Sequence, residues 1–370
     1  MKKKGKLPFL FAFLLIFSPY TTVLSHSEDE LILFSEAAIL IDAGSGQILY
    51  EKNSKMRMNP ASITKIVTGI MAIEQGNLDD IVTVSQEATE VHGTSVYLLE
   101  NEKIKLKQLV QGLLINSGND AGTAIAEYFS NNETDFANWM NDYVKTEIGV
   151  NDSNFTNPHG LFDENHYTTA YDMAQISQYA MNNNLFKVIV GTKELEWNGE
   201  GWQTTLYNHH RMLWDYEGVT GIKNGYTPQS GFTLVTSATR NNIDLIAVTL
   251  KSPSSQQAYQ DTGALLDYGF DTYSVETLSN NTLFEDEAGT EYKLNDNLSY
   301  LVPKNTEVTK KIRNGLLVIK KQDGSILLKE ELSKVVKPDE QKEVTQSSEV
   351  ELSKPNNNWI QQILQIFNIF

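Results

Sequence analysis

The chain has 370 residues, of which 40% are hydrophobic and 21% charged, enough for one large domain and a smaller one. This composition excludes a disordered chain, a collagen and a protein with many membrane spans. Thirty basic against 47 acidic residues give a formal net charge of −17, which argues against a nucleic-acid partner, because such proteins need a basic face. The absence of cysteine excludes disulfides, iron–sulfur sites and thiol nucleophiles.

The first 25 residues have the pattern of a secretory signal peptide. Four lysines precede an apolar run over residues 7–17, and the compact residues Val23-Leu24-Ser25 come later. The run is too short to span a bilayer, and an acidic stretch begins soon after Ser25, which disfavours an uncleaved anchor or a buried helix. We therefore expect residues 1–25 to be removed and the mature protein to work outside the cytoplasm.

Residues 26–272 predict a large domain with strands at both ends and helices between them. The predicted elements are, in chain order, strands 37–42 and 47–50, a helix over 60–76, two helices within 104–129 that are separated by a break at 116–119, strands 231–240 and 243–251, and a helix over 255–270. This order predicts an α/β sandwich in which the terminal strands share one antiparallel sheet.

Residues 273–337 predict a small β-rich C-terminal domain. Short apolar runs flank Asp323-Gly324, a dipeptide that favours a tight hairpin turn. Residues 338–358 are polar and indicate a linker. Residues 359–370 are apolar except on one side of a helical wheel, so we expect an amphipathic helix that anchors the protein to a membrane surface. Docking of this helix on the protein's own surface or on a partner is the alternative.

Candidate catalytic residues first occur at the start of the helix predicted over 60–76. Ser62-Ile63-Thr64-Lys65 places a hydroxyl and an ammonium three residues apart, on one face of a helix. A serine is inert at neutral pH unless a neighbouring group takes its proton. A lysine can take that proton only if burial or nearby positive charge lowers its pKa. By itself this four-residue pattern occurs by chance in many proteins.

Two further motifs follow in the chain. Ser117-Gly118-Asn119 lies in the break between two helical stretches, where a hydroxyl and an amide can face a cleft. Lys223-Asn224-Gly225 lies in a strand-like run, where a glycine permits close approach of a ligand. Together the three motifs are much more specific than any one of them alone.

In this order the motifs resemble those of the low-molecular-mass penicillin-binding proteins, the serine D-alanyl-D-alanine carboxypeptidases of the peptidase S11 type. The resemblance covers about residues 33–340 and includes the segment Thr156-Asn157-Pro158-His159-Gly160-Leu161. It implies a β-lactamase/transpeptidase-like sandwich of helices and an antiparallel sheet, followed by a small all-β domain.

The resemblance also implies which residues carry the reaction. Ser62 would attack the carbonyl carbon of the penultimate D-alanine and become the acyl-enzyme, and Lys65 would accept its proton. Ser117 would relay protons to the leaving amine, and Asn119 would hold Lys65 and the peptide backbone. The family's function is removal of the terminal D-alanine from peptidoglycan stem peptides, with β-lactams as covalent inhibitors.

The candidate substrate-binding residues, again by resemblance, are Lys223, Asn224, Gly225 and Tyr226. Lys223 would bind the terminal carboxylate, and its charge would favour a neutral Lys65 in the same cleft. The backbone N–H groups of Ser62 and Tyr226 would form the oxyanion hole. The family usually has Thr or Ser at position 224, so Asn224 leaves open a catalytically weakened, binding-only homologue.

Other enzyme classes fit less well. A serine β-lactamase of class A needs an E-x-x-L-N glutamate between the second and third motifs, and here that pattern occurs only at 291–295, inside the C-terminal β region. No G-x-S-x-G or H-E-x-x-H occurs, which disfavours a His-based serine hydrolase and a zinc enzyme. We expect no cofactor and no metal. The expected location is the outer face of the bacterial cytoplasmic membrane, with peripheral attachment.

Overall fold

A computed structural model describes residues 31–335 of the chain. The predicted signal peptide (1–25), linker (338–358) and C-terminal helix (359–370) lie outside the described residues, as do residues 26–30 and 336–337. Within residues 31–335, no helix combines the length and the apolar character that a bilayer crossing requires.

A five-stranded antiparallel sheet forms the centre of the larger part, with strand order β2-β1-β9-β8-β7. Its strands are β1 (Ala37–Asp42), β2 (Ile48–Lys52), β7 (Val219–Thr227), β8 (Gly231–Arg240) and β9 (Ile243–Ser252). All six residues of β1 are buried, which fits a strand that is covered on both faces. The pairing of β1 with β9 confirms that strands from both ends of this region share one sheet.

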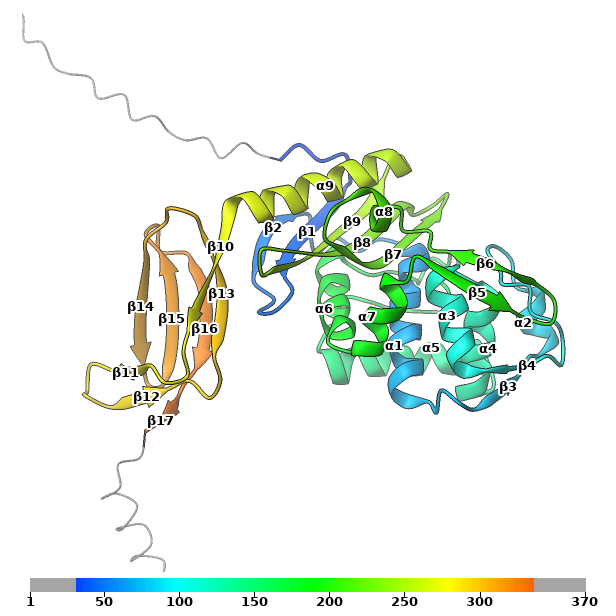
Figure 1. The fold of residues 1–370 in the computed structure, drawn as a ribbon, viewed down its shortest axis with the longest axis horizontal. Helices are drawn as coiled ribbons and strands as arrows, with labels where there is room; N and C mark the ends of the chain where they lie inside the picture. Colours follow the sequence, from blue (N-terminus) through cyan, green and yellow to red (C-terminus); the bar gives the residue numbers. More distant parts are fainter. Residues whose placement is uncertain (1–30, 336–370) are drawn as a thin grey trace, which may run out of the picture. The chain divides into compact units, whose positions relative to one another are not determined.

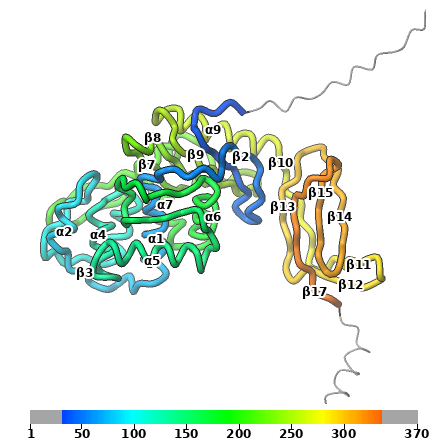
Figure 2. Tube along the Cα trace, turned by 180° about the vertical axis from the view of Figure 1, so that it is seen from behind, coloured from blue at the N-terminus to red at the C-terminus, as the bar shows by residue number. Residues whose placement is uncertain are grey.

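Helices cover both faces of this sheet, so the fold is the expected α/β sandwich (Figure 1). On one face lies α9 (Ser255–Thr272), where Gly269 allows close packing because a β-carbon there would meet Leu245 Cδ1 at 2.6 Å. The other face is covered by α1 (Lys65–Gln75), α6 (Ala170–Met181) and α7 (Asn184–Gly191). Figure 2 shows the two helical layers from behind.

A helical region packs around α1, which is buried along its first eight residues. The predicted break within 104–129 is present, because α3 (Leu106–Ile115) ends before α4 (Asn119–Ser130) begins. The remaining elements of this region are β3 (Ile81–Thr83), α2 (Gln86–Glu90), β4 (Lys103–Lys105), α5 (Glu133–Tyr143), a π-helical turn (Val144–Ile148), β5 (Glu194–Asn198), β6 (Gln203–Tyr207) and α8 (Met212–Asp215).

Residues 273–334 form only strands, turns and loops, and they have an apolar core of their own. Tyr300, Leu317 and Ile319 are almost completely buried in it. The strands are β10 (Tyr273–Leu278), β11 (Leu283–Glu285), β12 (Glu291–Lys293), β13 (Leu298–Pro303), β14 (Val308–Arg313), β15 (Leu316–Lys321), β16 (Ile326–Glu331) and β17 (Ser333–Lys334). The hairpin predicted around Asp323-Gly324 is the β15–β16 pair.

Candidate active site

Ser62 lies in a short 3-10 turn, Ala61–Thr64, that leads directly into α1. Ala61 has a positive φ of 51°, a conformation that costs free energy for a residue with a β-carbon and has to be held by its surroundings. Two hydrogen bonds hold the entry to this turn: Asn59 Oδ1 accepts from Ala61 N at 3.2 Å, and Thr233 Oγ1 donates to Pro60 O at 2.9 Å. The backbone around Ser62 is therefore fixed before any ligand binds.

Lys65 is the first residue of α1 and is completely buried. Its Nζ lies 3.1 Å from Ser62 Oγ, 2.7 Å from Asn119 Oδ1 and 2.6 Å from the carbonyl oxygen of His159. The amide and carbonyl oxygens can only accept, so each takes an N–H of the amine. A neutral lysine amine has two N–H groups and one lone pair, and this arrangement leaves the lone pair for the hydroxyl of Ser62.

Burial is the main reason why the pKa of Lys65 lies well below its usual value of 10.5, and the positive charge of Lys223 lowers it further. Lys223 is also almost completely buried, and burial lowers its pKa to about 7. The side chain at 65 can thus be neutral while the one at 223 still carries charge. A neutral amine at 65 can act as a base, and a charged amine at 223 can bind an anion.

The break between α3 and α4 positions the second motif. Ser117 has a positive φ of 65° and is 5% exposed, and its hydroxyl has no hydrogen-bond partner within the described part of the chain. Asn119 begins α4 and joins two segments, because its Nδ2 donates to His92 O at 2.6 Å while its Oδ1 accepts from Lys65. Asp120 is buried beside it and accepts from the backbone N–H groups of Val96 and Leu98.

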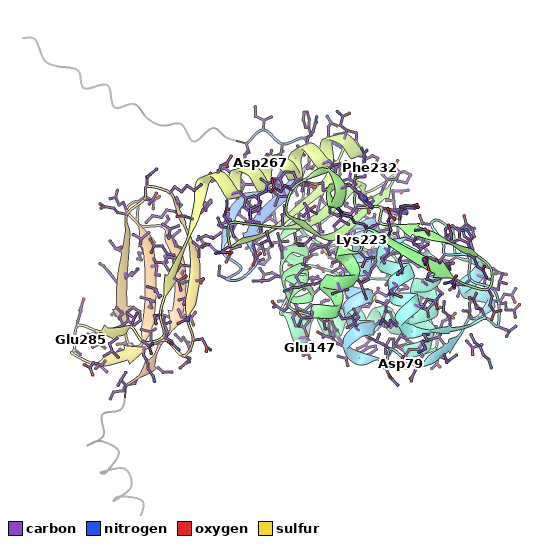
Figure 3. The ribbon with its side chains drawn as sticks, in the orientation of Figure 1. Asp79, Glu147, Lys223, Phe232, Asp267 and Glu285 are labelled. Carbon is purple, nitrogen blue, oxygen red and sulfur yellow. The ribbon has the colours of Figure 1, made fainter. Side chains whose placement is uncertain are left out.

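The third motif lies on β7, which is the outermost strand of the central sheet beside the Ser62 turn. Lys223, labelled in Figure 3, donates to Asn224 O at 3.0 Å and lies 3.4 Å from Asn224 Oδ1. A β-carbon on Gly225 would lie 2.7 Å from Ser62 N, so only glycine allows this approach. Tyr226 is half exposed, and its ring packs against Phe232 with centroids 4.4 Å apart.

Asn224 alternates with Lys223 and Gly225 along β7, and its side chain still meets that of Lys223, with Oδ1 3.4 Å from Nζ. It lines a small pocket of about 70 Å³ together with Phe232, Ser255 and Tyr259. With Oδ1 toward Lys223, its Nδ2 has no hydrogen-bond partner in residues 31–335 and can donate to a ligand. The same Oδ1 takes up part of the hydrogen-bonding capacity that Lys223 could offer to a carboxylate.

Sequence reasoning missed the structural role of residues 156–161, although it noted the segment. His159 supplies the carbonyl oxygen to Lys65, and a β-carbon on Gly160, whose φ is 87°, would overlap the carbonyl oxygen of Ala61. The His159 ring accepts from Leu161 N at Nδ1 and lies 3.1 Å from Glu133 at Nε2. Burial lowers the pKa of His159, so the ring is neutral and donates to Glu133.

His166 fixes the same turn from another side. Its Nδ1 accepts from Thr156 N at 3.1 Å, which makes Nε2 the donor to Thr64 Oγ1 at 2.9 Å. Burial lowers the pKa of His166 to about 3, so the ring stays neutral at physiological pH. No residue pattern marks these contacts, because half of them involve backbone atoms. Asp120 could have been noticed from the sequence, because it directly follows Asn119 near the start of a predicted helix, where an acidic residue is favourable.

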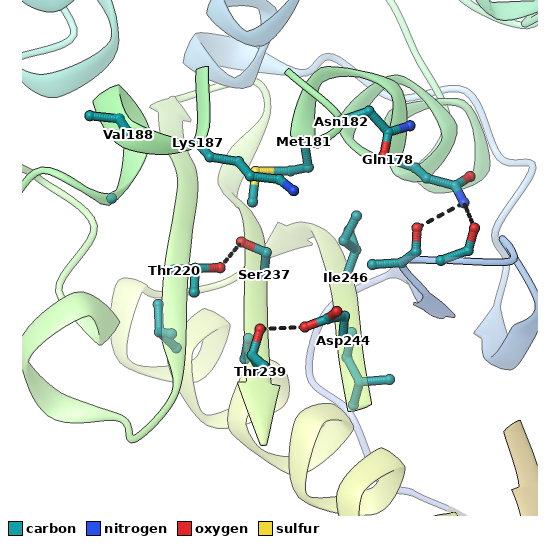
Figure 4. A pocket seen from close by; sticks show the side chains of 16 residues that line it. Gln178, Met181, Asn182, Lys187, Val188, Thr220, Ser237, Thr239, Asp244 and Ile246 are labelled. Carbon is teal, nitrogen blue, oxygen red and sulfur yellow. Dashed lines mark hydrogen bonds between the residues drawn. The ribbon is translucent and has the colours of Figure 1, made fainter. Parts of the chain in front are cut away.

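A second cavity, of about 570 Å³, lies between α6, α7 and the far ends of β7, β8 and β9 (Figure 4). Its lining includes Gln178, Lys187, Ser237 and Asp244, but none of the predicted site residues. The E-x-x-L-N pattern at 291–295 lies at β12 in the C-terminal β region, where Asn295 Oδ1 accepts from Ser333 Oγ. Within residues 31–335, no group of three or more His, Asp or Glu side chains is arranged to hold a metal ion.

Comparison with solved structures places this fold among the penicillin-binding proteins. Penicillin binding protein 5 of Haemophilus influenzae superposes with a TM-score of 0.72 at 27% identity, over 82% of this chain and 97% of that one. Penicillin binding protein 6B of Escherichia coli gives 0.70 at 26% identity, over 83% and 98%. The model of the D-alanyl-D-alanine carboxypeptidase family, peptidase S11, matches residues 24–254. The chain belongs to this family, which confirms the resemblance inferred from its motifs.

Among characterised relatives, D-alanyl-D-alanine carboxypeptidase DacF of Bacillus subtilis is 34% identical over 256 residues. This match covers 67% of the present chain and 65% of DacF. The chain thus aligns with slightly less than two thirds of that relative's length.

Proposed function

We propose that this protein is a serine-type D-alanyl-D-alanine carboxypeptidase that removes the terminal D-alanine from peptidoglycan stem peptides. The observation that carries the proposal is the position of Lys65 Nζ, held by Asn119 Oδ1 and His159 O with its lone pair left for Ser62. The names of the family and of its relatives support the substrate class.

In the proposed acylation step, Ser62 Oγ attacks the carbonyl carbon of the penultimate D-alanine while its proton moves to Lys65. The backbone N–H groups of Ser62 and Tyr226 stabilise the oxyanion, which is consistent with the close approach of β7 at Gly225. The proton accepted by Lys65 then passes through Ser117 to the amine of the departing D-alanine, which leaves Lys65 and Ser117 in their starting protonation states. Water then hydrolyses the acyl-enzyme and restores the serine.

Recognition of a free C-terminus is assigned to Lys223, because a buried cation beside the nucleophile selects a carboxylate. β7 is the outer strand of its sheet, so its free edge can pair with an extended peptide and present that peptide's carbonyl to Ser62. Asn224 Nδ2 is available as an additional donor to the same carboxylate.

A catalytically weakened, penicillin-binding homologue is the second candidate, and Asn224 is the observation that favours it. Its Oδ1 lies 3.4 Å from Lys223 Nζ and competes with a substrate carboxylate for that cation. A β-lactam acylates Ser62 through its strained ring and depends less on this subsite than an unstrained peptide does. The second candidate therefore predicts penicillin labelling without appreciable release of D-alanine.

The deciding experiment measures D-alanine released from a diacyl-Lys-D-Ala-D-Ala peptide by the mature chain, in parallel with covalent labelling by a fluorescent penicillin. The carboxypeptidase proposal requires both signals, and both should be lost in Ser62→Ala. Ser130→Ala, at the end of α4, is the matched control and should retain both. Labelling that persists in Ser62→Ala would exclude Ser62 as the nucleophile, and labelling without release would establish the second candidate.

We further propose that the protein is exported and remains attached to the outer face of the cytoplasmic membrane through residues 359–370. The signal-like pattern of residues 1–25 and the apolar, amphipathic pattern of 359–370 support this location. Deletion of 359–370 should yield a chain that no longer sediments with vesicles and is still labelled by penicillin. Unchanged sedimentation after the deletion would contradict the anchor.

A further inference from the structure

The β14-β15-β16 sheet carries a cluster of cations on one face, although the chain as a whole is strongly acidic. Residues that are paired across an antiparallel sheet point to the same side. Lys311, Val318 and Lys329 are paired across the three strands and therefore share a face. Arg313 and Lys320, paired with Leu316 and Thr309, lie on the same side, because they are two residues from Lys311 and Val318 along their strands.

This cationic face is the outer one. Leu317 and Ile319 alternate with Val318 along β15 and are completely buried in the core of residues 273–334, so the side chains of Val318 and its cross-strand partners point away from that core. The aliphatic side chains of Leu316, Val318 and Ile326 lie between the cations, and Ile326 is 48% exposed.

The four cations have no partners within residues 31–335. Lys311, Arg313, Lys320 and Lys329 form no ion pair there, whereas Lys310, which points to the other side of β14, lies 3.7 Å from Glu276. Residues 273–335 contain nine basic and ten acidic residues, against a net charge of −17 for the chain. The four cations on this face are thus unpaired within residues 31–335, and a basic composition does not explain them.

A hollow of about 1050 Å³ lies over the face and is bordered by the acidic turn Glu285–Glu287 of the β11–β12 hairpin (Glu285 is labelled in Figure 3). Asp286 is engaged within its own turn, where it accepts from the N–H groups of Ala288 and Thr290. Glu331, paired with Leu316, is the carboxylate that the strand pairing places among the four cations. The strand face itself is therefore positive, and the acidic turn lies at one border of the hollow over it.

We propose that this face, formed by Lys311, Arg313, Lys320 and Lys329 with the aliphatic side chains between them, docks onto a membrane surface rich in anionic phospholipid. Lys and Arg near such a surface are attracted to the negative headgroups, and aliphatic side chains between them can enter the interface. The hollow can receive a phosphate headgroup between the basic side chains.

The position of this face in the chain favours a membrane as the partner. β17 ends at Lys334, and the predicted membrane helix begins at residue 359 after the predicted linker over 338–358. A flexible linker of that length has a root-mean-square span of roughly 25 Å. The β region would thus be held at high effective concentration near the bilayer, so weak electrostatic contacts suffice for docking. This step rests on the proposed membrane attachment through 359–370.

The experiment compares binding of the full mature chain to vesicles of phosphatidylcholine alone and to vesicles with added phosphatidylglycerol. The docking variant is K311Q/R313Q/K329Q, and the matched control is K103Q/K107Q/K145Q, which removes three exposed lysines elsewhere. At low salt the docking variant should bind the anionic vesicles on the order of 100-fold more weakly than the unaltered chain, about fivefold for each cation. The control variant should keep the preference for anionic vesicles. High salt should abolish that preference in the unaltered chain.

Two further measurements separate this proposal from the proposed membrane anchor and the proposed activity. Binding to phosphatidylcholine reports the helix at 359–370, and penicillin labelling reports an intact active site, so both should be unchanged in the docking variant. The proposal is wrong if the unaltered chain shows no preference for anionic vesicles, or if the docking variant retains that preference. It is also wrong if the unaltered chain binds soluble poly(glycerol phosphate) but does not prefer anionic vesicles. A third contrary result would be a preference for anionic vesicles that emerges only when the acidic residues within 339–351 are neutralised, because that segment would then be the occupant of the cationic face.

Discussion

Gly225 and Ser62 lie in such close contact that a β-carbon on Gly225 would be 2.7 Å from the backbone nitrogen of Ser62. Strand β7 and the nucleophile's turn therefore pack with no room for a side chain between them at this position. This contact brings the third motif to the first one, although the two are more than 150 residues apart in the sequence.

Gly225→Ala should separate the two segments and slow acylation. We expect the second-order rate of penicillin labelling to fall at least 100-fold, because the methyl group displaces either β7 or the N–H of Ser62 from the oxyanion position. Stopped-flow labelling measures this rate. The control is Gly263→Ala in α9, where the nearest atom to the new methyl is 3.9 Å away; it should leave labelling intact and stabilise the helix slightly. Equal rates in both variants would contradict the contact.

Carboxypeptidase activity should follow a bell-shaped pH profile. kcat/KM should rise with pH as Lys65 loses its proton, and fall through about pH 7 as Lys223 loses the charge that binds the carboxylate. A substrate ending in D-alanine amide has no carboxylate and should lack the alkaline decline. The assignment of Lys223 fails if the amide and the free acid decline together.

Lys223→Met should abolish D-alanine release and at the same time stabilise the fold at pH 6. The folded-state pKa of Lys223, about 7, lies below the unfolded value near 10.5, so the unfolded chain binds more protons between these limits. The free energy of unfolding of the unaltered protein therefore rises with pH across this window, and the ammonium is fully destabilising below it.

The expected gain for Lys223→Met at pH 6 is on the order of 5 kcal/mol, and it should shrink as the pH approaches 10.5. Denaturant titrations at pH 6 and at pH 9.5 measure both values. Lys103→Met, at an exposed position in β4, should change stability little at either pH. A gain that is independent of pH would show that hydrophobic packing, and not removal of a buried charge, is responsible.

Asn224→Thr should raise kcat/KM for the peptide about tenfold. The substitution removes the Oδ1 atom that lies beside Lys223 and supplies a hydroxyl donor, and threonine also favours a strand. Steady-state release of D-alanine measures the effect, and Asn182→Thr, at an exposed position after α6, is the control. An unchanged kcat/KM would mean that the Asn224 amide already serves the carboxylate as well as a hydroxyl does.

Much of the fold was predictable because its signals are local. The β8–β9 hairpin turns at Asn241-Asn242, and both residues adopt the positive φ that asparagine tolerates better than most residues. The continuous apolar run at 37–42 is typical of a strand buried on both faces, and β1 is such a strand. In contrast, the small pairs β3–β4 and β5–β6 were not predicted, since three to five residues carry too little periodicity.

For the candidate site, the sequence predicted only which side chains take part and their order along the chain. Ser62, Lys65 and Asn119 do meet, as the motif spacing and the resemblance implied. The His159 carbonyl and the fit of Gly160 against Ala61 were not predictable, because backbone atoms carry no residue signature and their contacts depend on tertiary packing. Similarly, the hydrogen bonds that Asp120 accepts from the loop at 96–98 join residues that have no pattern in common.

The pairing of β1 with β9 dictates when the chain can complete its fold. Leu40 pairs with Ala247, so the central sheet stays open at this position until some 250 residues have been synthesised. Pairings of such long sequence separation close slowly, and the apolar edges of β1 and β8 remain available to other chains in the meantime. The yield of folded protein is therefore sensitive to premature termination, and helper proteins that shield nascent strands should improve it.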